Sequence, residues 1–250
     1  MTRSKYILIG DVHGCLTELQ ALLGRIAPGP DDILVFLGDL VDKGPDSPGV
    51  VRWVRHLSTL YRVVLIEGNH EEKHRRWRQH IRLGSPVVLT MTGTQQIAAI
   101  TQAMSAADIA FLETGRLYFR ILHYDALVVH AGVPPAIATL PDDPQEIVTY
   151  TRQQRDLYGK MQRIRFVSPE GKILQLGHET ERDRYWAELY DGRLGTVYFG
   201  HQVFLAPTPV AFPHAIALDL GAVHGGYLAA AVLSEHGVTY EVEPARRAYA

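Results

Sequence analysis

The sequence lacks the features that would tie it to an oxidising compartment, a membrane or nucleic acid. Its single cysteine, Cys15, excludes an internal disulfide framework and fits a reducing compartment. Its formal net charge of −2 gives no global attraction to nucleic acid or to an anionic membrane. No stretch approaches the roughly 20 apolar residues of a membrane span, and the N-terminal apolar run is too short for a secretion signal. We therefore expect a cytoplasmic protein with no membrane partner and no stable nucleic-acid binding.

What the chain does have is a series of short apolar runs with helical patterns between them. Residues 5–9, 33–37 and 62–66 are rich in branched side chains and predict strands buried on both faces. Helical patterns follow each run, the second beginning at Ser47 and the third near His70. This β-α-β-α order predicts a parallel or mixed sheet with helices packed over it.

The remainder predicts further strands around a polar segment. Residues 93–113 have a helical pattern, and 117–121 and 125–130 predict two paired strands. Residues 140–190 are polar, contain few apolar runs, and predict an inserted cap or lid of helices and loops. Strand-like runs then return at 195–199, 215–219, 227–233 and 238–242. Because there is no repeat or linker, residues 1–250 are expected to form a single domain.

Polar residues follow five of the predicted strands at the point where each strand ends. The stretches are "LIGDVHGC", "GDLVDKGP", "EGNHEE", "HAG" and "GH", and glycine lies beside the polar residues, as tight turns at strand ends require. Ligands bind at the carboxyl ends of strands in open α/β sheets. Six side chains should therefore converge on one edge: Asp11, His13, Asp39, Asn69, His130 and His201.

This set of side chains has the composition of a metal site. It contains carboxylates, imidazoles and an amide but no thiolate, which excludes a structural zinc of the cysteine type. Mixed oxygen and nitrogen ligands suit manganese, iron, zinc or nickel, and six side chains are too many for one open catalytic ion. Two ions sharing a carboxylate account for the number. Paired ions about 3.5–4 Å apart are a recurrent means of hydrolysing phosphate esters, because they generate hydroxide and hold the phosphoryl oxygens.

The stretches also resemble a known family. "GDVHG", "GDLVDKG", "GNHE", "HAG" and "GH" occur in order over residues 10–201 and are similar to the five signature blocks of the calcineurin-like metallophosphoesterases. The resemblance is strongest to the phosphoprotein-phosphatase branch, with its bacterial serine/threonine phosphatases and diadenosine-tetraphosphatase-like relatives. It implies an α/β fold of mixed β-sheets sandwiched by helices, with an inserted cap segment, and a metal-dependent hydrolase with two divalent ions, manganese before iron, zinc or nickel.

The same resemblance implies a role for each matching residue. Asp39 would bridge the two ions. His70 would be the general acid for the leaving group, and Asp42 would orient it and keep it protonated; an imidazole beside a carboxylate holds its proton to higher pH. The other ligands would divide between the ions: Asp11 and His13 on the first, and Asn69, His130 and His201 on the second.

Three positions bear on the substrate. Lys43 stands where protein phosphatases usually have a phosphate-binding arginine, and Glu67 also replaces an arginine common before "GNH"; both departures argue against a phosphoprotein. In the cap segment, Arg184 and the neighbouring Trp186 are candidates for contacts with the phosphates and base of a nucleotide, or alternatively belong to a surface packed on the sheet. Lys43 and Arg184 are therefore the candidate substrate-binding residues.

Three functions remain open from the sequence. The leading prediction is a phosphatase that hydrolyses phosphate monoesters by attack of metal-bound hydroxide, on a phosphorylated small molecule, a nucleotide or a phosphoprotein. The alternative is a hydrolase of dinucleoside polyphosphates resembling diadenosine tetraphosphate. A non-catalytic metal-bearing scaffold is disfavoured because all six ligands and His70 are present. A Rossmann-type nucleotide binder fails because no G-x-G-x-x-G follows the first strand.

Other polar residues carry weaker signals. The histidines outside the motifs, among them His74, are interpreted as surface or structural residues. The basic run at 73–82 is interpreted as a solvated helix face or as a positive rim that attracts anionic substrates.

Overall fold

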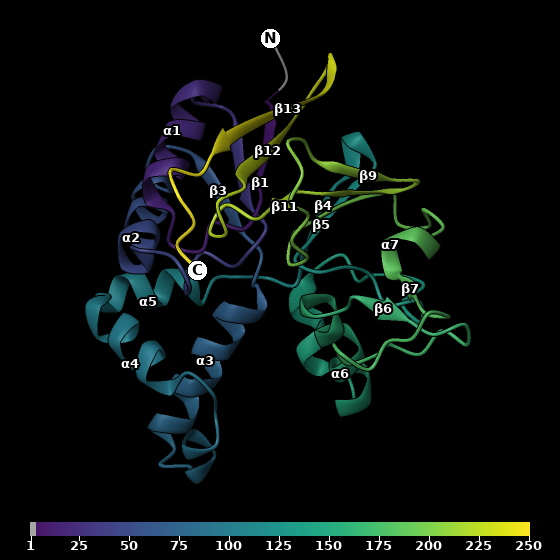
Figure 1. The fold of residues 1–250 in the computed structure, drawn as a ribbon, viewed down its shortest axis with the longest axis horizontal. Coiled ribbons are helices and arrows are strands. Elements are labelled where there is room, and N and C mark those ends of the chain that lie inside the picture. Colours follow the sequence, from purple (N-terminus) through teal and green to yellow (C-terminus); the bar gives the residue numbers. More distant parts are fainter. Residues whose placement is uncertain (1–3) are drawn as a thin grey trace.

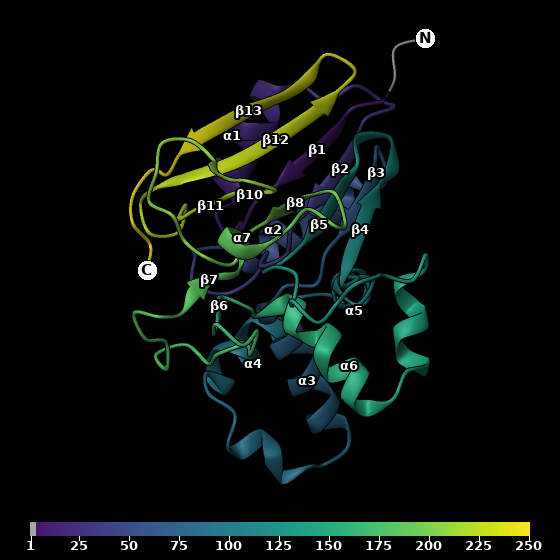
Figure 2. The same cartoon turned by 90° about the vertical axis from the view of Figure 1, so that its right-hand side faces the viewer.

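Two mixed β-sheets packed face to face form the centre of the computed structural model, which describes residues 4–250 (Figures 1 and 2). Residues 1–3, part of the N-terminus considered above for a secretion signal, lie outside the described residues. The first sheet has the order β11-β12-β1-β2-β3. β13 also belongs to this sheet and pairs with β12 along the edge opposite to β1. β1, β2 and β3 run parallel, and β12 is antiparallel to β1. The strand bounds are β1 (Tyr6–Ile9), β2 (Ile33–Phe36), β3 (Arg62–Leu65), β11 (Asp219–Leu220), β12 (Tyr227–Ser234) and β13 (Gly237–Pro244).

The second sheet has the order β4-β5-β8-β10-β9. β5, β8 and β10 are parallel to one another, whereas β4 and β9 pair antiparallel at the two edges. The predicted pairing of 117–121 with 125–130 is confirmed by β4 and β5. The bounds are β4 (Tyr118–Ile121), β5 (Ala126–Val129), β8 (Thr196–Phe199), β9 (Val210–Phe212) and β10 (Ala215–Ala217).

The apolar runs are continuous because both faces of each sheet are covered. In β1, Ile7 and Ile9 pack toward the helices, while Leu8 packs between the two sheets with residues such as Val35 and Val128. Alternate side chains of a strand point to opposite faces, so a strand buried on both sides needs apolar residues at every position. The expected mixed sheets sandwiched by helices are thus confirmed.

Five helices cover the outer face of the first sheet and its edge (Figure 1). The segment 93–113, which has one helical pattern, forms two helices because Ser105 begins the second: its hydroxyl accepts a hydrogen bond from the Asp108 N–H in a capping box. The bounds are α1 (Leu16–Ile26), α2 (Ser47–Leu57), α3 (Asn69–Arg82), α4 (Thr94–Ala103) and α5 (Ala106–Leu112), with short 3₁₀ helices η1 (Pro86–Leu89) and η2 (Leu122–Tyr124).

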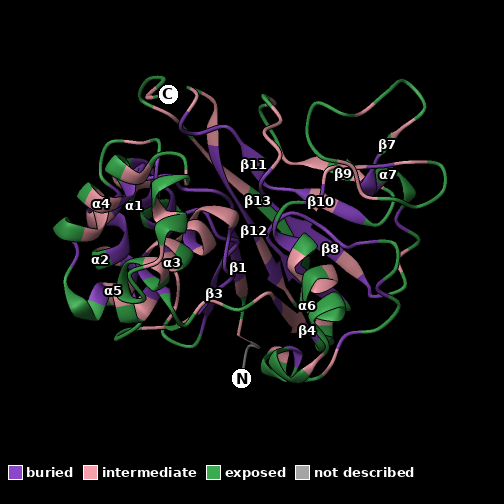
Figure 3. Cartoon of the chain, turned by 90° about the horizontal axis from the view of Figure 1, so that it is seen from below, coloured by how far each residue is buried: buried purple, intermediate pink, exposed green. Residues whose placement is uncertain are grey.

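Residues 140–190, called the cap segment below, lie over the outer face of the second sheet. Met161, Ile164 and Trp186 pack there against Val129 and Phe199, while α6 and the loops around it are largely exposed (Figure 3). Besides helices and loops, the segment contains a small two-stranded sheet. Its elements are η3 (Pro144–Thr149), α6 (Arg152–Gly159), η4 (Lys160–Gln162), β6 (Phe166–Val167), β7 (Arg184–Tyr185) and α7 (Trp186–Leu189).

Across residues 4–250, none of the helices combines the length and the apolar character needed to cross a membrane.

Candidate metal centre

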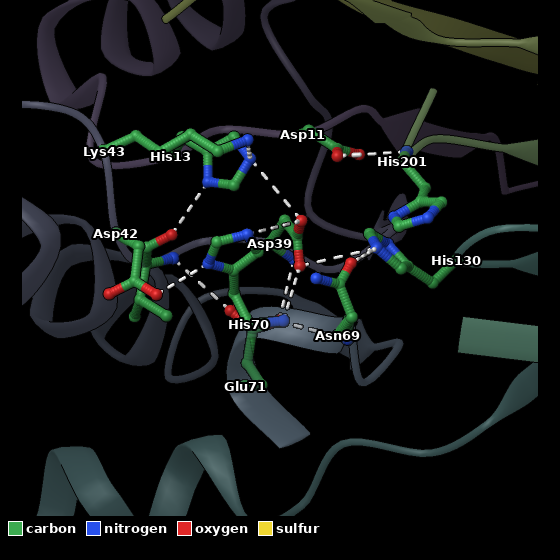
Figure 4. A network of polar contacts seen from close by, with 12 residues as sticks. Asp11, His13, Asp39, Asp42, Lys43, Asn69, His70, Glu71, His130 and His201 are labelled. Atoms are coloured by element: carbon green, nitrogen blue, oxygen red, sulfur yellow. Dashed lines mark hydrogen bonds and ion pairs between the residues drawn. The ribbon is translucent and has the colours of Figure 1, made fainter. Parts of the chain in front are cut away.

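The polar residues that follow the strands meet at one edge of the two sheets (Figure 4). β1 and β2 of the first sheet lead to Asp11, His13 and Asp39, and β3 leads into α3, which begins at Asn69. From the second sheet, β5 leads to His130 and β8 to His201. The strand-end argument therefore places residues from both sheets around one point.

Asp39 lies at the middle of this cluster. Its Oδ2 is 3.5 Å from His13 Nε2 and 3.9 Å from His70 Nε2, and its Oδ1 is 3.4 Å from His130 Nε2. Two groups of residues could each hold a metal ion, because the ligand atoms within each group lie within 4.8 Å of one another. One group is His13, Asp39 and His70, and the other is Asp39, His130 and His201. Asp39 is common to both groups, which is the arrangement that a bridging carboxylate needs.

Backbone carbonyls set the orientation of two of the imidazoles. His13 Nδ1 donates to the Val41 carbonyl at 2.8 Å, and His130 Nδ1 donates to the Leu37 carbonyl at 2.8 Å. Each bond directs Nε2 toward Asp39, as hydrogen bonds to the opposite ring nitrogen do for metal-ligating histidines. Asn69 completes this side of the cluster, with its Oδ1 2.9 Å from His130 Nε2.

The two histidines differ in their protonation. Burial, together with the charge of Lys43, lowers the pKa of His13 to about 4, so at neutral pH its Nε2 carries a lone pair instead of a proton. Burial also lowers the pKa of His130, but the carboxylates of Asp39 and Asp11 outweigh it and raise that pKa to about 9. His130 must therefore lose a proton to become a ligand.

Two unpartnered buried atoms show that the cluster fits cations. Within residues 4–250, neither Asp11 Oδ1 nor His201 Nε2 has a hydrogen-bond partner, although both atoms are buried. Burial and the neighbouring charge of Asp219 raise the pKa of Asp11 well above its usual value. A bound divalent ion would relieve this repulsion and engage the free atoms. Among the described residues Asp11 falls outside both ligand groups; its Oδ2 accepts the His201 N–H at 3.0 Å.

The backbone of the centre is held in an unusual conformation. Five of the seven non-glycine residues with positive φ among residues 4–250 belong to the cluster: His13, Asp39, Asp42, Lys43 and His201. Such conformations cost free energy and persist where the surrounding structure enforces them, often at functional sites.

The buried carboxylate of Glu71 holds the loop after β2, which contains Asp39, in this conformation. It accepts hydrogen bonds from the N–H groups of Asp39, Leu40 and Val41 and from that of Gly68 at the start of α3. It thereby joins the loop after β2 to the helix that carries Asn69. The sequence motif "GNHE" contains this residue, but sequence reasoning assigned it no role.

Glycine is required where the motif loops cross. A Cβ at Gly68 would collide with Asp39 Oδ1, and a Cβ at Gly200 would collide with Asp11 Oδ1. The glycines beside the polar residues therefore serve close packing of the ligands as well as the turn.

Asp42 connects two histidines of α3. His70 Nδ1 donates to Asp42 Oδ2 at 2.6 Å, and His74 Nε2 donates to Asp42 Oδ1 at 2.8 Å. Although burial raises the pKa of Asp42, these hydrogen bonds lower it below its usual value, so the carboxylate is ionised. His74 is fully buried, in keeping with its interpretation as structural, and its spacing of four residues from His70 is the signal that could have linked it to the site.

The candidate substrate-binding residues lie in different surroundings. Lys43 Nζ is 2.9 Å from His13 Nε2, at the cluster itself. Arg184 is exposed on β7. Trp186 is buried against Phe199, with ring centroids 5.0 Å apart. The expectation that it stacks on a base is therefore wrong, and the alternative, that it packs on the sheet, describes its position.

Two other arginines of the cap segment do approach the cluster. Arg165 donates from Nε to Gln202 Oε1 at 2.9 Å and from Nη2 to the His201 carbonyl at 3.3 Å. Burial and the charges of His130 and Arg165 hold the pKa of His201 well below its usual value, and Arg163 acts in the same direction. Sequence reasoning missed both arginines because they belong to no recognised motif.

The charges around Glu67 are largely compensated. Glu67 Oε1 accepts a hydrogen bond from Arg75 Nε at 2.5 Å, and its Oε2 accepts one from the Gln162 amide at 2.9 Å. Arg78 pairs with Glu113 in the same way. Arg75, Arg76 and Arg78 of the basic run at 73–82 are thus paired with acids, which argues against the positive rim considered above.

Comparison with known proteins gives the same assignment as the geometry. The model of the family "Calcineurin-like phosphoesterase" matches residues 4–205. A bis(5'-nucleosyl)-tetraphosphatase PrpE [asymmetrical] of Bacillus subtilis is 32% identical, with 89% of this chain and 88% of the relative covered. A symmetrical bis(5'-nucleosyl)-tetraphosphatase of Chromohalobacter salexigens is 28% identical, with 95% and 97% covered.

A solved structure provisionally identified as a diadenosine tetraphosphatase has a TM-score of 0.70 and 27% identity, covering 96% of this chain and 93% of its own. A yeast serine/threonine phosphatase similar to human PP5 has a TM-score of 0.58 at 14% identity, which shows the fold alone. The two tetraphosphatases named above favour the alternative prediction, the dinucleoside polyphosphate hydrolase, over the monoesterase. The chain belongs to the calcineurin-like phosphoesterases and is a metal-dependent hydrolase of that family.

Proposed function

We propose that the chain hydrolyses dinucleoside tetraphosphates at a centre of two divalent ions. The observation that carries the proposal is the pair of ligand groups that share Asp39. The tetraphosphatases that resemble this chain over about nine-tenths of its length point to the substrate class.

In this proposal the ligands divide as the motifs suggest. His13 and Asp11 would hold one ion, His130, His201 and Asn69 would hold the other, and Asp39 would contribute to both. Oxygen and nitrogen donors of this kind suit manganese. When bound, the ions activate water and polarise the phosphoryl oxygens. Asp11 Oδ1 and His201 Nε2 are buried without hydrogen-bond partners among residues 4–250, so a bound metal ion would give each of these atoms a partner.

Side chains of the protein protonate the leaving group. The attacking water gives one proton to solvent as its oxygen bonds to phosphorus and the bridging P–O bond breaks. The His70 Nε2 proton passes to the departing phosphate oxygen, and His70 then takes a proton from solvent. Asp42 holds the opposite nitrogen of His70, and His74 holds Asp42. The His70 side chain is 18% exposed, against 4% for His13 and 0% for His130, so it can reach a substrate.

A cleft large enough for a ligand bigger than a phosphomonoester lies between α3, the loop before β4 and the cap segment. Its volume is about 790 Å³, and its lining includes Glu67, two residues before Asn69, but none of the candidate metal ligands. Ligand sites typically have volumes of about 300–1,000 Å³. Glu72 lines this cleft and accepts a hydrogen bond from Arg163 Nη2 at 2.6 Å. We propose Lys43 and Arg163 as phosphate contacts; the role of Arg184 stays a prediction.

The test is a comparison of three substrates on the manganese-loaded protein: diadenosine tetraphosphate, a phosphoserine peptide and p-nitrophenyl phosphate. We expect kcat/KM for the dinucleotide to exceed that for the peptide by at least about tenfold, with loss of activity on chelation. Chromatography should show mononucleotide products, either ATP with AMP or two ADP. An intact dinucleotide beside a hydrolysed peptide would overturn the proposal in favour of the phosphoprotein reading.

A further inference from the structure

The chain returns to the metal centre after β13, along residues 245–250, called the tail below. Glu18 Oε1, in a side chain that is almost fully buried, accepts the Arg246 N–H at 3.1 Å and the Tyr249 hydroxyl at 2.8 Å. The N–H groups of Tyr249 and Ala250 both donate to the Val223 carbonyl. These bonds fix the path of the tail along the start of α1, and Figure 1 shows the C-terminus beside the loops that precede α2.

A cavity of about 290 Å³ lies between the tail and the loop after β2. It is lined by Lys43, Gly44, Pro45, Arg247, Ala248 and Tyr249. Two of these described residues are cations and none is an acid. The Arg247 guanidinium lies over the Tyr249 ring, 5.2 Å from its centroid, and the same tyrosine is bonded to Glu18. Arg247 is thus exposed, but its guanidinium is positioned by the Tyr249 ring, which is held in place by its hydrogen bond to Glu18.

Lys43 joins this cavity to the centre. Its ammonium lies 2.9 Å from His13 Nε2, and the same residue lines the cavity. Both Asp42 and Lys43 have positive φ, at 70° and 63°, so the loop cannot relax to an ordinary turn without losing this placement. An anion that extends from the centre past Lys43 would next meet Arg247.

We infer that Arg247 of the tail, together with Lys43, binds a phosphate of the substrate other than the one that is attacked. The inference rests on the proposed function and names a specificity-determining residue for it. A lysine supplies a single point charge, whereas a polyphosphate carries several charges along its length, and arginine adds a bidentate contact. A phosphomonoester, with one phosphate at the ions, would not extend to Arg247.

The experiment compares Arg247→Ala with the matched control Arg246→Ala. Arg246 is also an exposed arginine of the tail, but it does not line the cavity. We expect Arg247→Ala to raise KM for diadenosine tetraphosphate and Ki for inorganic tripolyphosphate by about three- to tenfold. KM for p-nitrophenyl phosphate and Ki for orthophosphate should stay within about twofold of wild type. Arg247→Lys should recover part of the loss, and Arg246→Ala should behave as wild type throughout.

Tripolyphosphate inhibition of p-nitrophenyl phosphate hydrolysis, measured at constant free manganese, separates this inference from the proposed function. If wild type leaves the dinucleotide intact, the proposed function fails, but the ratio of tripolyphosphate to orthophosphate affinity still tests Arg247. Calorimetric titration of tripolyphosphate into both variants gives a readout independent of turnover. Unchanged tripolyphosphate affinity in Arg247→Ala would overturn the inference even if the wild type cleaves the dinucleotide, as would an equal loss in Arg246→Ala.

Discussion

The candidate ligands of the metal centre are buried and are held by hydrogen bonds to backbone atoms. Much of the cap segment, by contrast, is exposed and approaches the centre with Arg163 and Arg165. Asp39 and His130 are at most 2% exposed; the His70 N–H donates to Asp39 Oδ1, and His130 Nδ1 donates to the Leu37 carbonyl. In the cap segment, α6 contributes no buried residue. If the proposed function holds, we expect the centre to determine whether any phosphoester is cleaved, and the cap segment and the tail to determine which.

The largest effect should follow from removing the residue shared by both ligand groups. Asp39→Asn removes the charge that holds the two groups together, so we expect loss of at least one ion and a fall in kcat of more than about 10²-fold on every substrate. Elemental analysis and p-nitrophenyl phosphate assays measure both. Asp156→Asn, an exposed aspartate of α6, serves as the control. An Asp39→Asn protein that keeps two ions and normal turnover would refute the shared-ligand arrangement.

His70 should affect turnover according to the leaving group. His70→Asn should keep the ions but lower kcat for an alkyl phosphate by about 10²–10⁴-fold, the range for general acid–base catalysis. The loss should be smaller for p-nitrophenyl phosphate, whose leaving group needs little protonation. Because His70 also lies in one of the ligand groups, metal content must be measured with the rates. Equal losses on both substrates, or loss of an ion, would remove His70 from the acid role.

The two ligand groups should respond differently to pH. The pKa of His130 in the metal-free protein is near 9, so this histidine holds a proton below pH 9. An ion must displace that proton, so the metal affinity of the group that contains His130 should fall about tenfold per pH unit from pH 9 to pH 7. His13, with its pKa near 4, is already neutral in this range and adds no such dependence. Calorimetry in buffers of different ionisation heat should show about one proton released per pair of ions at pH 7.5. Pairs of ions that bind without proton release would contradict this difference.

The smallest of these effects should come from the cap segment. Arg163→Ala removes a cation that pairs with Glu72 beside the cleft, so we expect KM for diadenosine tetraphosphate to rise by about three- to tenfold with metal content unchanged. Arg152→Ala, on the exposed face of α6, should leave KM unaltered. If Arg163→Ala instead lowers metal content, the cap segment supports the centre rather than selecting the substrate.

Sequence alone was informative where one local rule decides the structure. The branched apolar runs became β1, β2 and β3, and the polar residues after them converged because strands of one sheet end at one edge. It was less informative where tertiary contacts decide. The cap segment has no periodicity that shows Trp186 buried and Arg163 at the cleft, and His74 contacts Asp42 only because α3 packs beside the loop after β2.

The most direct test of the central claim is anomalous diffraction from crystals grown with excess manganese. We expect two peaks about 3.5–4 Å apart, both in contact with the Asp39 carboxylate, one beside His13 and the other beside His130 and His201. A single peak, with the Asp39 carboxylate turned away from it, would contradict the two-ion centre.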